Sequence, residues 1–249
     1  MSTRVLVLRS GGIPFPRPEA NAGFDLVEKA THEIRPRPTD FAALAEPASL
    51  AVFTSQIAVR ILLGDPEGSV RFRDCLTGGR VGAVGDATAE ALRRLGVEPA
   101  FVAAGYGSSV LDMLPADLDG RRVILPRGAD ATDELADGLR RRRARVVLLV
   151  LYDKEPVPRD PGLDAEIAGG SFSGFCATSP AAARWLFETS TEKALGRLRE
   201  TPAVVLGRFT GRYLESHGIA RVSESAEPSF SSAFDALRGL ALAATAPPA

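Results

Sequence analysis

The sequence predicts an α/β protein whose strands are buried and parallel. Two observations lead to this fold class. Short runs of Val, Leu and Ile alternate with longer segments of helical periodicity. The 249 residues are also 45% apolar and 24% charged, as in an ordinary globular protein. A chain of this length forms one large domain or two small ones, either of which can bury a core.

Seven apolar runs are predicted strands, and four of the longer segments between them are clear predicted helices. The strands, in chain order, are Val5–Leu8, Leu50–Phe53, Arg80–Val84, Val123–Leu125, Val146–Leu151, Gly174–Ala177 and Ala203–Leu206. The helices are Ala87–Leu95, Asp133–Arg142, Ala181–Phe187 and Phe230–Leu240.

Three proline-rich stretches interrupt this alternation. Arg35–Pro38 and Glu155–Pro161 favour extended chain without helix, so they are candidate linkers. The third, Ile13–Pro18, follows the first strand, where a doubly wound fold would usually place a helix.

Charge and cysteine content exclude several classes of function. The net charge of −1 gives no general attraction to nucleic acid or to an anionic membrane. Cys75 and Cys176 are far apart in sequence, and neither His32 nor His217 has metal-ligand spacing with them, so a metal site or disulfide framework is disfavoured. Both histidines are therefore expected to be structural. The chain shows no signal peptide and no apolar run near about 18 residues, which predicts a cytoplasmic protein.

The two halves of the sequence repeat four parts in the same order. Each half has an Arg after an apolar run, a Thr-Ser pair before a helix, a Gly-x-x-Thr turn before a helix, and a Ser pair before a helix. The first half contains Arg9 (followed by Ser10), Thr54-Ser55, Gly85-x-x-Thr88 and Ser108-Ser109. The second half contains Arg127, Thr178-Ser179, Gly207-x-x-Thr210 and Ser231-Ser232.

The repeated polar residues fall at turns after strands, where ligands bind in open α/β sheets. Free N–H groups and a partial positive charge at helix N-termini favour carboxylates or phosphates. Ser and Thr are also the commonest helix caps, so each hydroxyl alone is explained by capping. Gly85 and Gly207 allow either close approach to a ligand or an unusual dihedral angle. Arg9 and Arg127 are carboxylate clamps or solvated loop residues.

Nucleotide-binding and hydrolase motifs are lacking. The glycines form neither GxGxxG nor GxxxxGK[ST], and no GxSxG elbow occurs. Tyr152 is the best single candidate for chemistry, because it ends a long apolar run at the second linker. A phenol beside a cleft can donate a proton without a metal, although Tyr152 could equally pack the end of the strand.

These motifs together resemble the uroporphyrinogen-III synthase family over nearly the whole chain. Each motif alone is weak, but their order and spacing are fairly specific. They are Phe53-Thr54-Ser55, Val84-Gly85-x-x-Thr88 with Ala89, Leu92 and Gly96, Tyr106-x-Ser108-Ser109, Pro126-Arg127-Gly128, Tyr152, Ala177-Thr178-Ser179 and Gly207-x-x-Thr210.

The resemblance implies two flavodoxin-like, doubly wound parallel-sheet domains joined by a two-stranded linker. The first domain would be discontinuous, comprising residues 1–34 and 158–249, and the second would comprise residues 39–151. The linkers would lie at about residues 35–38 and 152–157, where the sequence is rich in proline. The family usually has a helix where this chain has Ile13–Pro18, and often a Gly where it has Arg143-Ala144.

The family's activity is a cofactor-free lyase reaction of tetrapyrrole biosynthesis, on the route to haem, sirohaem and cobalamin. Hydroxymethylbilane, which carries eight carboxylates, loses water and closes with inversion of ring D to give uroporphyrinogen III. The resemblance implies a monomer that receives this substrate from hydroxymethylbilane synthase. It makes Tyr152 the candidate to assist departure of the hydroxyl. Carboxylates would bind at Arg9, Ser10, Thr54, Ser55, Gly85, Thr88, Ser108, Arg127, Thr178, Ser179, Gly207 and Thr210.

Two other functions remain open at this point. The same scaffold could be a non-catalytic, two-lobed binding module for a polycarboxylate or tetrapyrrole, although the presence of Tyr152 favours the enzyme. A flavodoxin-like protein that binds flavin or nucleotide is disfavoured, because the sequence has no phosphate loop.

Overall fold

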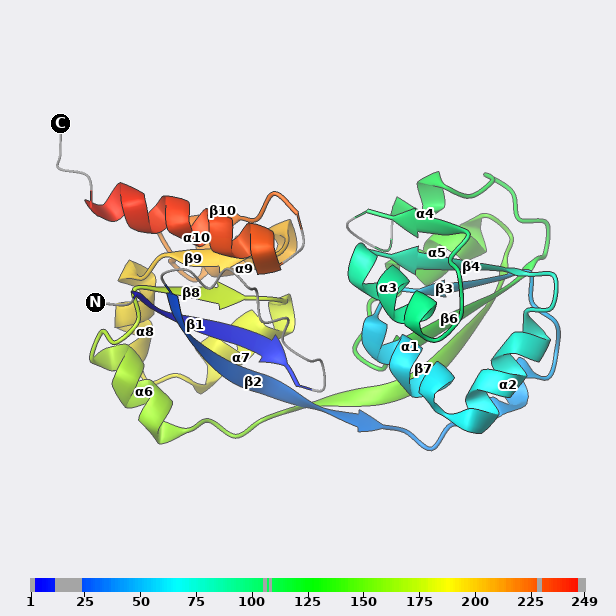
Figure 1. Cartoon of the computed structure of the whole chain (residues 1–249), viewed down its shortest axis with the longest axis horizontal. Helices are drawn as coiled ribbons and strands as arrows, with labels where there is room; N and C mark the ends of the chain where they lie inside the picture. The colour runs from blue at the N-terminus through cyan, green and yellow to red at the C-terminus, as the bar shows by residue number, and fades with distance from the viewer. Residues whose placement is uncertain (1–2, 12–23, 105–106, 108, 228–229, 246–249) are drawn as a thin grey trace. The chain divides into compact units, whose positions relative to one another are not determined.

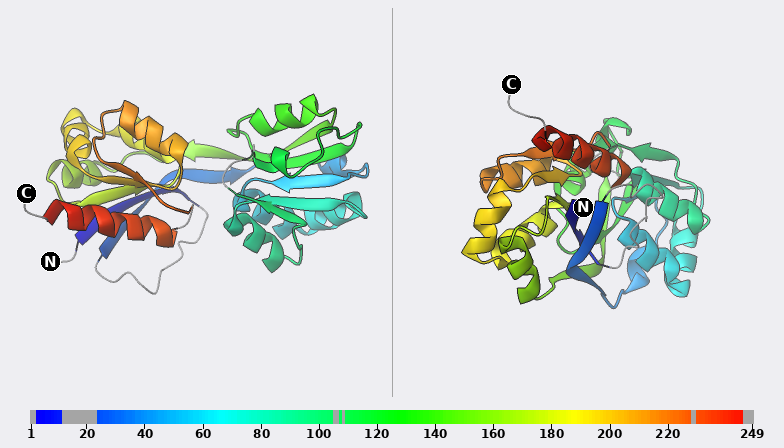
Figure 2. Two further views of the ribbon diagram at one scale, coloured as in Figure 1. Left: turned by 90° about the horizontal axis from the view of Figure 1, so that it is seen from above. Right: turned by 60° about the vertical axis from the view of Figure 1, so that its left-hand side comes forward.

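The computed structural model describes residues 3–11, 24–104, 107, 109–227 and 230–245, and divides into two compact units (Figure 1). Unit 1 comprises Met1–Glu33 and Glu155–Ala249, and unit 2 comprises Ile34–Lys154. Across the described residues, each unit is built around five parallel strands with helices on both faces, as Figure 2 shows. The predicted fold class is confirmed. The predicted Pro-rich segment 13–18 lies outside the described residues.

The strands of unit 1 follow the order β10-β9-β8-β1-β2. Their bounds are β1 Thr3–Ser10, β2 Phe24–Pro36, β8 Gly174–Ala177, β9 Ala203–Val205 and β10 Val222–Glu224. The helices are α6 Pro161–Ala168, α7 Pro180–Thr189, α8 Glu192–Glu200, α9 Arg208–Ser216 and α10 Phe230–Thr245. Alternate residues of β1 face opposite cores, because successive side chains of a strand point to opposite sides. Leu6 and Leu8 pack with α7, whereas Val5 and Val7 pack with Phe234 of α10.

The strands of unit 2 follow the matching order β5-β4-β3-β6-β7. Their bounds are β3 Leu50–Phe53, β4 Arg80–Val84, β5 Phe101–Ala103, β6 Arg122–Gly128 and β7 Arg145–Pro156. The helices are η1 Phe41–Leu44, α1 Gln56–Gly64, α2 Pro66–Cys75, α3 Asp86–Arg94, α4 Ser109–Asp112 and α5 Glu134–Arg141. One core forms between the sheet and the helices α4 and α5. On the other side of the sheet, the rings of Phe53 and Phe72 pack edge to face, with their centroids 5.4 Å apart.

All seven predicted strands and all four predicted helices are present, but β2, β5 and β10 were not predicted. β2 was missed because its residues, FDLVEKATHEIRP, mix apolar side chains with polar and charged ones and end in proline. It lacks the apolar run of a strand buried on both faces, and most of its side chains are partly or fully exposed.

Both chain crossings between the units lie at the ends of long strands. β2 begins in unit 1 and ends in unit 2, and β7 does the reverse, with the division at residues 33/34 and 154/155. This exchange places Arg9, from the first half of the sequence, in the same unit as Thr178 and Gly207. The repeat is therefore not a simple tandem of domains.

Candidate functional site

In unit 2, the predicted polar residues lie where β3, β4, β6 and β7 approach or reach their carboxyl ends. Thr54 and Ser55 follow β3, Gly85 follows β4, and Gly128 ends β6. Tyr152 lies in β7 opposite Gly128. Because the strands are parallel, these residues share one edge of the sheet, which is where such folds bind ligands.

Ser55 links the phenol of Tyr152 to the N-terminus of α1. Its Oγ accepts the backbone N–H of Ile57 at 3.1 Å and the hydroxyl of Tyr152 at 3.2 Å. The sequence predicted Ser55 as either a helix cap or a ligand-binding residue, and the structure shows the cap. The tyrosine hydroxyl is thereby held at the positive end of a helix.

A β-bulge and a glycine position the ring of Tyr152. Arg127 pairs with Val150, but the next pair is Gly128 with Tyr152, so Leu151 is the extra residue of the bulge. Such bulges reorient a side chain and are common next to active sites. A Cβ atom on Gly128 would lie 2.7 Å from a carbon of the Tyr152 ring. Tyr152 is 3% exposed, and β7 continues past it to Pro156, so Tyr152 lies inside the strand and not at its end, where the sequence had placed it.

Four charged residues near Tyr152 were not singled out from the sequence, and they form two ion pairs. Lys154 Nζ donates to Asp130 Oδ2 at 2.8 Å, and the alternation of β7 places Lys154 on the same face as Tyr152. Asp153 accepts two N–H groups of Arg37 at 2.7 Å, and this hydrogen bond lowers the pKa of its carboxyl. Asp153 is therefore ionised at neutral pH and is no proton donor.

Arg127 holds the protein's own loop. Its side chain is 8% exposed, and Nη1 lies 2.7 Å from Oδ1 of Asp133. The same guanidinium donates to the carbonyl groups of Gly128, at 3.3 Å, and Ala131. In this structure the carboxylate beside Arg127 is that of Asp133, which follows the loop after β6.

The Gly85-x-x-Thr88 turn begins α3 without a side-chain cap. Gly85 has φ +76°, a left-handed conformation that favours glycine, and the N–H groups of Thr88 and Ala89 donate to its carbonyl. Thr88 is 5% exposed and faces the interior of the unit. Ser108 lies outside the described residues.

Unit 1 places its predicted residues at the corresponding edge of its own sheet. Arg9 is the penultimate residue of β1, and its Nη2 lies 3.0 Å from Oε2 of Glu28 on β2. Ser10 ends β1 and pairs with His32. The Thr178 hydroxyl donates to the carbonyl of Leu8 at 3.0 Å.

The two helices that follow this edge of unit 1 begin differently. Ser179 Oγ accepts the N–H of Ala182 at 3.2 Å and caps α7. Gly207 begins α9 without a side-chain cap, in an extended conformation with φ −171°. Thr210 is 3% exposed, whereas Phe209 beside it is 43% exposed and lies under the guanidinium of Arg208 at 5.2 Å.

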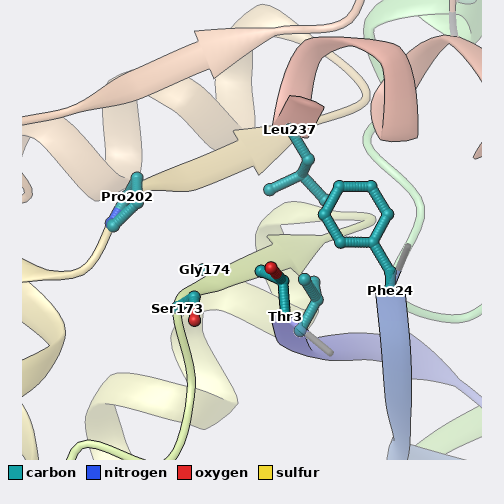
Figure 3. Close-up of a pocket in the computed structure, with 7 residues that line it drawn as sticks. Thr3, Phe24, Ser173, Gly174, Pro202 and Leu237 are labelled. Carbon is teal, nitrogen blue, oxygen red and sulfur yellow. The ribbon is translucent and has the colours of Figure 1, made fainter. Parts of the chain in front are cut away.

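Figure 3 shows a small cavity at the opposite edge of the unit 1 sheet. Thr3, Phe24 and Gly174 line it at the amino ends of their strands, with Leu237 of α10. Its volume of about 10 Å³ holds at most one water molecule, so it is not a site for a large substrate. Within the described residues, no group of three His, Cys, Asp or Glu side chains could hold a metal ion, and no helix is long and apolar enough to span a bilayer.

Known proteins of one family share this fold. A family model described as uroporphyrinogen-III synthase HemD matches residues 19–235. Two solved structures are similar over nearly the whole chain. A mutant uroporphyrinogen III synthase from Thermus thermophilus has a TM-score of 0.65 and 22% identity, and the match covers 98% of this chain and 100% of that one. A uroporphyrinogen-III synthetase from Helicobacter pylori has a TM-score of 0.63 and 16% identity, and the match covers 96% of this chain and 100% of that one. No curated protein sequence gives a significant match.

At these identities the solved structures establish the fold alone, whereas the family model covers well over half of the chain. The chain belongs to the uroporphyrinogen-III synthase family.

Proposed function

We propose that this chain closes hydroxymethylbilane to uroporphyrinogen III and that Tyr152 assists departure of the terminal hydroxyl. The family match supports the reaction, a dehydration catalysed by a lyase, and nothing in the comparisons favours a non-catalytic binding module. The observation that carries the role of Tyr152 is its hydrogen bond to Ser55 at the N-terminus of α1.

The two hydroxyl groups form a pair that can exchange donor and acceptor roles. In the structure Tyr152 donates to Ser55. When Tyr152 instead donates to the substrate hydroxyl, the Ser55 hydroxyl can rotate and donate to the phenol oxygen. The phenol proton then passes to the leaving oxygen, water departs, and the pyrrole nitrogen stabilises the resulting cation. Ser55 and the helix N-terminus stabilise the charge on the phenolate.

The carboxylates of the substrate are proposed to bind at the carboxyl edges of the two sheets. In unit 2 the binding residues would be Thr54, Ser55, Gly85, Thr88 and Ser108, and in unit 1 Ser10, Thr178, Ser179, Gly207 and Thr210. The uncapped N-termini of α3 and α9 support this proposal, since backbone N–H groups there attract anions. Arg9 and Arg127 are paired with Glu28 and Asp133, so we assign them to shaping these edges.

Positioning accounts for the choice of product. The cation must be attacked at the substituted carbon of ring D, giving a spiro intermediate that reopens and closes again with the ring inverted. Direct closure at the free carbon would give the symmetric type I isomer. Fixing the reacting carbons near each other can supply several kcal/mol of the barrier reduction. We further propose that the enzyme acts as a cytoplasmic monomer that receives its substrate from hydroxymethylbilane synthase.

Replacement of Tyr152 by Phe tests this role. The variant keeps the ring against Gly128 and removes only the hydroxyl, so we expect the rate of type III formation to fall by about 100-fold, the usual size of a proton-transfer contribution. Binding of uroporphyrinogen III, followed by calorimetry under anaerobic conditions, should be retained.

Tyr213→Phe is the matched control, because Tyr213 lies on α9 and stacks on His217 at 4.0 Å. It should retain the rate of the unmodified protein. A Tyr152→Phe variant as active as the control would remove Tyr152 from the mechanism.

A further inference from the structure

The carboxylate of Asp130 lies beside the phenol of Tyr152 in unit 2. Asp130 is in the turn directly after β6. A Cβ atom on Gly128 would lie 2.8 Å from Cζ of Tyr152 and 2.9 Å from Oδ1 of Asp130. Both atoms therefore surround the same point, and the carboxylate is a close neighbour of the end of the ring that carries the hydroxyl.

Lys154 holds Asp130 by its other oxygen. Nζ of Lys154 donates to Oδ2 at 2.8 Å, whereas Oδ1 is the oxygen beside the Tyr152 ring. The side chains of Lys154 and Asp130 are 22% and 41% exposed. An ion pair this exposed contributes little to stability, so the fold does not account for its place beside the phenol. The effect of the pair is to orient the carboxylate at this edge of the sheet.

The backbone around this carboxylate has a counterpart in unit 1. Thr31 is the extra residue of a bulge in β2, as Leu151 is in β7. The residue that follows the bulge is therefore His32 in unit 1 and Tyr152 in unit 2. The two residues match in position within their own units.

The carboxylate itself has no counterpart in the sequence of unit 1. The N–H groups of Gly11 and Ala129 donate to the carbonyl groups of these two matching residues, at 2.7 Å and 2.9 Å. The next residue in the chain is Asp130 in unit 2 and Gly12 in unit 1. The carboxylate thus accompanies the phenol and is not part of the repeated frame.

The chemistry of a carboxylate restricts what it can bind in the substrate. An ionised carboxylate only accepts hydrogen bonds, so its ligand must bring a donor. The donors of hydroxymethylbilane are its pyrrole N–H groups and its hydroxyl. In the ring that carries the hydroxymethyl group, the hydroxyl oxygen and the pyrrole nitrogen are attached to adjacent carbon atoms. A ring whose hydroxyl meets Tyr152 therefore brings its N–H close to Asp130.

We propose that Asp130 is a second catalytic residue, which binds this pyrrole N–H and stabilises the cation that forms when water departs. This role rests on the proposed function. The phenol proton passes to the hydroxyl oxygen, the C–O bond breaks with its electron pair leaving in water, and the nitrogen lone pair is shared with the carbon left behind. The positive charge on the nitrogen strengthens its hydrogen bond to the carboxylate, so Asp130 favours the cationic transition state over the neutral substrate. The proton stays on the nitrogen, and Lys154 is the positioning residue of Asp130.

Asp130→Asn tests the proposal by removing the charge from an exposed side chain of nearly unchanged size. The Asn carbonyl can still accept the N–H, but it cannot balance a full positive charge. We expect kcat for type III formation to fall by about 100-fold, with KM changed less than about threefold. Asp130→Glu keeps the charge and should retain more of the rate than Asp130→Asn. Spontaneous closure does not interfere, because it gives the type I isomer.

Two variants of Lys154 test its positioning role. Lys154→Met leaves the carboxylate charged but without its partner, so kcat should fall by about tenfold with little change in KM. Lys154→Arg can remake the ion pair and should recover most of this loss. Equal rates in the two variants would contradict the positioning role.

Asp117→Asn is the matched control. Asp117 also belongs to unit 2 and accepts from Nε of Arg143 at 2.9 Å, but both residues precede their strands and lie at the opposite edge of the sheet. This variant should retain kcat. An Asp130→Asn variant with the same kcat as the control, or with a raised KM alone, would overturn the role of Asp130. If the unmodified protein forms no type III isomer, the proposed function itself fails, whereas type III formation that is insensitive to Asp130 overturns this inference alone.

Discussion

Unit 1 and unit 2 share the same strand order and a bulge on the long strand. In each unit a Ser caps the helix that follows the central strand, α7 after β8 in unit 1 and α1 after β3 in unit 2. The two units nevertheless present different side chains at matching places. Unit 2 offers a phenol at Tyr152, and unit 1 offers an imidazole at His32. Tyr152 is held through Ser55, whereas His32 is held through Thr31. The difference teaches that the duplicated backbone fixes the place of these side chains, while the residue type at each place differs between the units.

The Gly-x-x-Thr turns differ in charge as well as in conformation. Gly85 has a positive φ and is followed by Asp86, whereas Gly207 is extended and is followed by Arg208. A carboxylate approaching α9 meets a helix N-terminus reinforced by a cation. At α3 the same approach meets an acidic side chain. Unit 1 is therefore the more electropositive of the two edges at this turn.

The largest expected effect concerns a buried ion pair at the crossing into unit 1. Arg159 Nη2 lies 2.6 Å from Oδ1 of Asp164, and the two side chains are 9% and 12% exposed. In unit 1, Asp164 lies four residues after Asp160, which caps α6. In unit 2, the residue four positions after the capping Asp40 is the buried Leu44. Asp164→Ala leaves a buried cation without its partner, so we expect it to destabilise unit 1 by about 3–5 kcal/mol.

The single cysteine in each unit allows this loss to be measured separately. Cys176 of unit 1 is fully buried, which raises its pKa to about 12, and Cys75 of unit 2 is 3% exposed. A thiol reagent therefore modifies each cysteine only when its unit opens. Asp164→Ala should accelerate modification of Cys176 by roughly 100-fold or more, since 1.4 kcal/mol is a factor of ten, and leave Cys75 unchanged. Equal acceleration at both cysteines would contradict the assignment.

The contribution of Asp164 should also depend on pH. Burial raises the pKa of its carboxyl, but the hydrogen bonds from Thr191 and Arg159 outweigh this, and the net pKa is lowered. A lowered pKa in the folded state stabilises the fold above the unfolded value of about 4, and this stabilisation disappears as the pH falls through the folded pKa. The difference in unfolding free energy between Asp164→Ala and the unmodified protein should therefore shrink in acid, as urea titrations at several pH values would show.

Gly128→Ala tests the packing that holds Tyr152 in unit 2. The added Cβ would meet the Tyr152 ring at 2.7 Å and push it from its place beside Ser55. A displacement of about 1 Å costs on the order of 100-fold in rate, so type III formation should fall by about that factor. Ser10, the matching residue in unit 1, already carries a Cβ, so this steric demand is specific to unit 2.

Gly64→Ala provides the control in unit 2, because a Cβ there meets no atom within 4 Å. Its rate should match that of the unmodified protein. If Gly128→Ala were equally active, close packing of Gly128 against Tyr152 would have no catalytic importance.

A smaller effect should follow from the charge difference between the two Gly-x-x-Thr turns. Replacing Arg208 by Gln should raise KM for the polycarboxylate substrate by about two- to fivefold, and Asp86→Asn should lower it by a similar factor, as expected for charges near helix N-termini. Both shifts should decrease at high ionic strength. Shifts of the same sign in the two variants would contradict the assigned polarity.

The smallest expected effect concerns Gly196 in the middle of α8. A Cβ at Gly196 meets no atom within 4 Å, so Gly196→Ala should stabilise unit 1 by about 0.5–1 kcal/mol through helix propensity. In α5 of unit 2, the Cβ added by Gly138→Ala would lie 2.4 Å from the Leu111 side chain. Because this contact is too close, Gly138→Ala should not stabilise unit 2. Thermal unfolding of the two variants measures the contrast.

The sequence was sufficient to predict the repeated turns because their signals are local. Ser55 and Ser179 precede apolar helical segments and do cap them. The apolar run before Tyr152 was correctly predicted as a strand, although β7 continues past Tyr152 to Pro156 and Tyr152 lies opposite Gly128. These features depend on short-range periodicity and on capping, which a single sequence shows directly.

The remaining features depend on contacts between distant segments. Arg127 was a candidate clamp because it follows a buried strand, and its contact with Asp133 could not be identified from spacing alone. The correspondence in position between His32 and Tyr152 was not predicted, since it is visible only in the register of β2 against β1. A bulge changes which face each later residue occupies, and no local pattern in the sequence marks the bulge at Thr31.

The most direct test of the account is the isomer composition of the product. Hydroxymethylbilane is generated in the presence of the unmodified protein, the products are oxidised, and the type I and type III uroporphyrins are separated by chromatography. The account predicts an excess of type III without any added cofactor. Type I alone, from a protein shown to be folded, would contradict it.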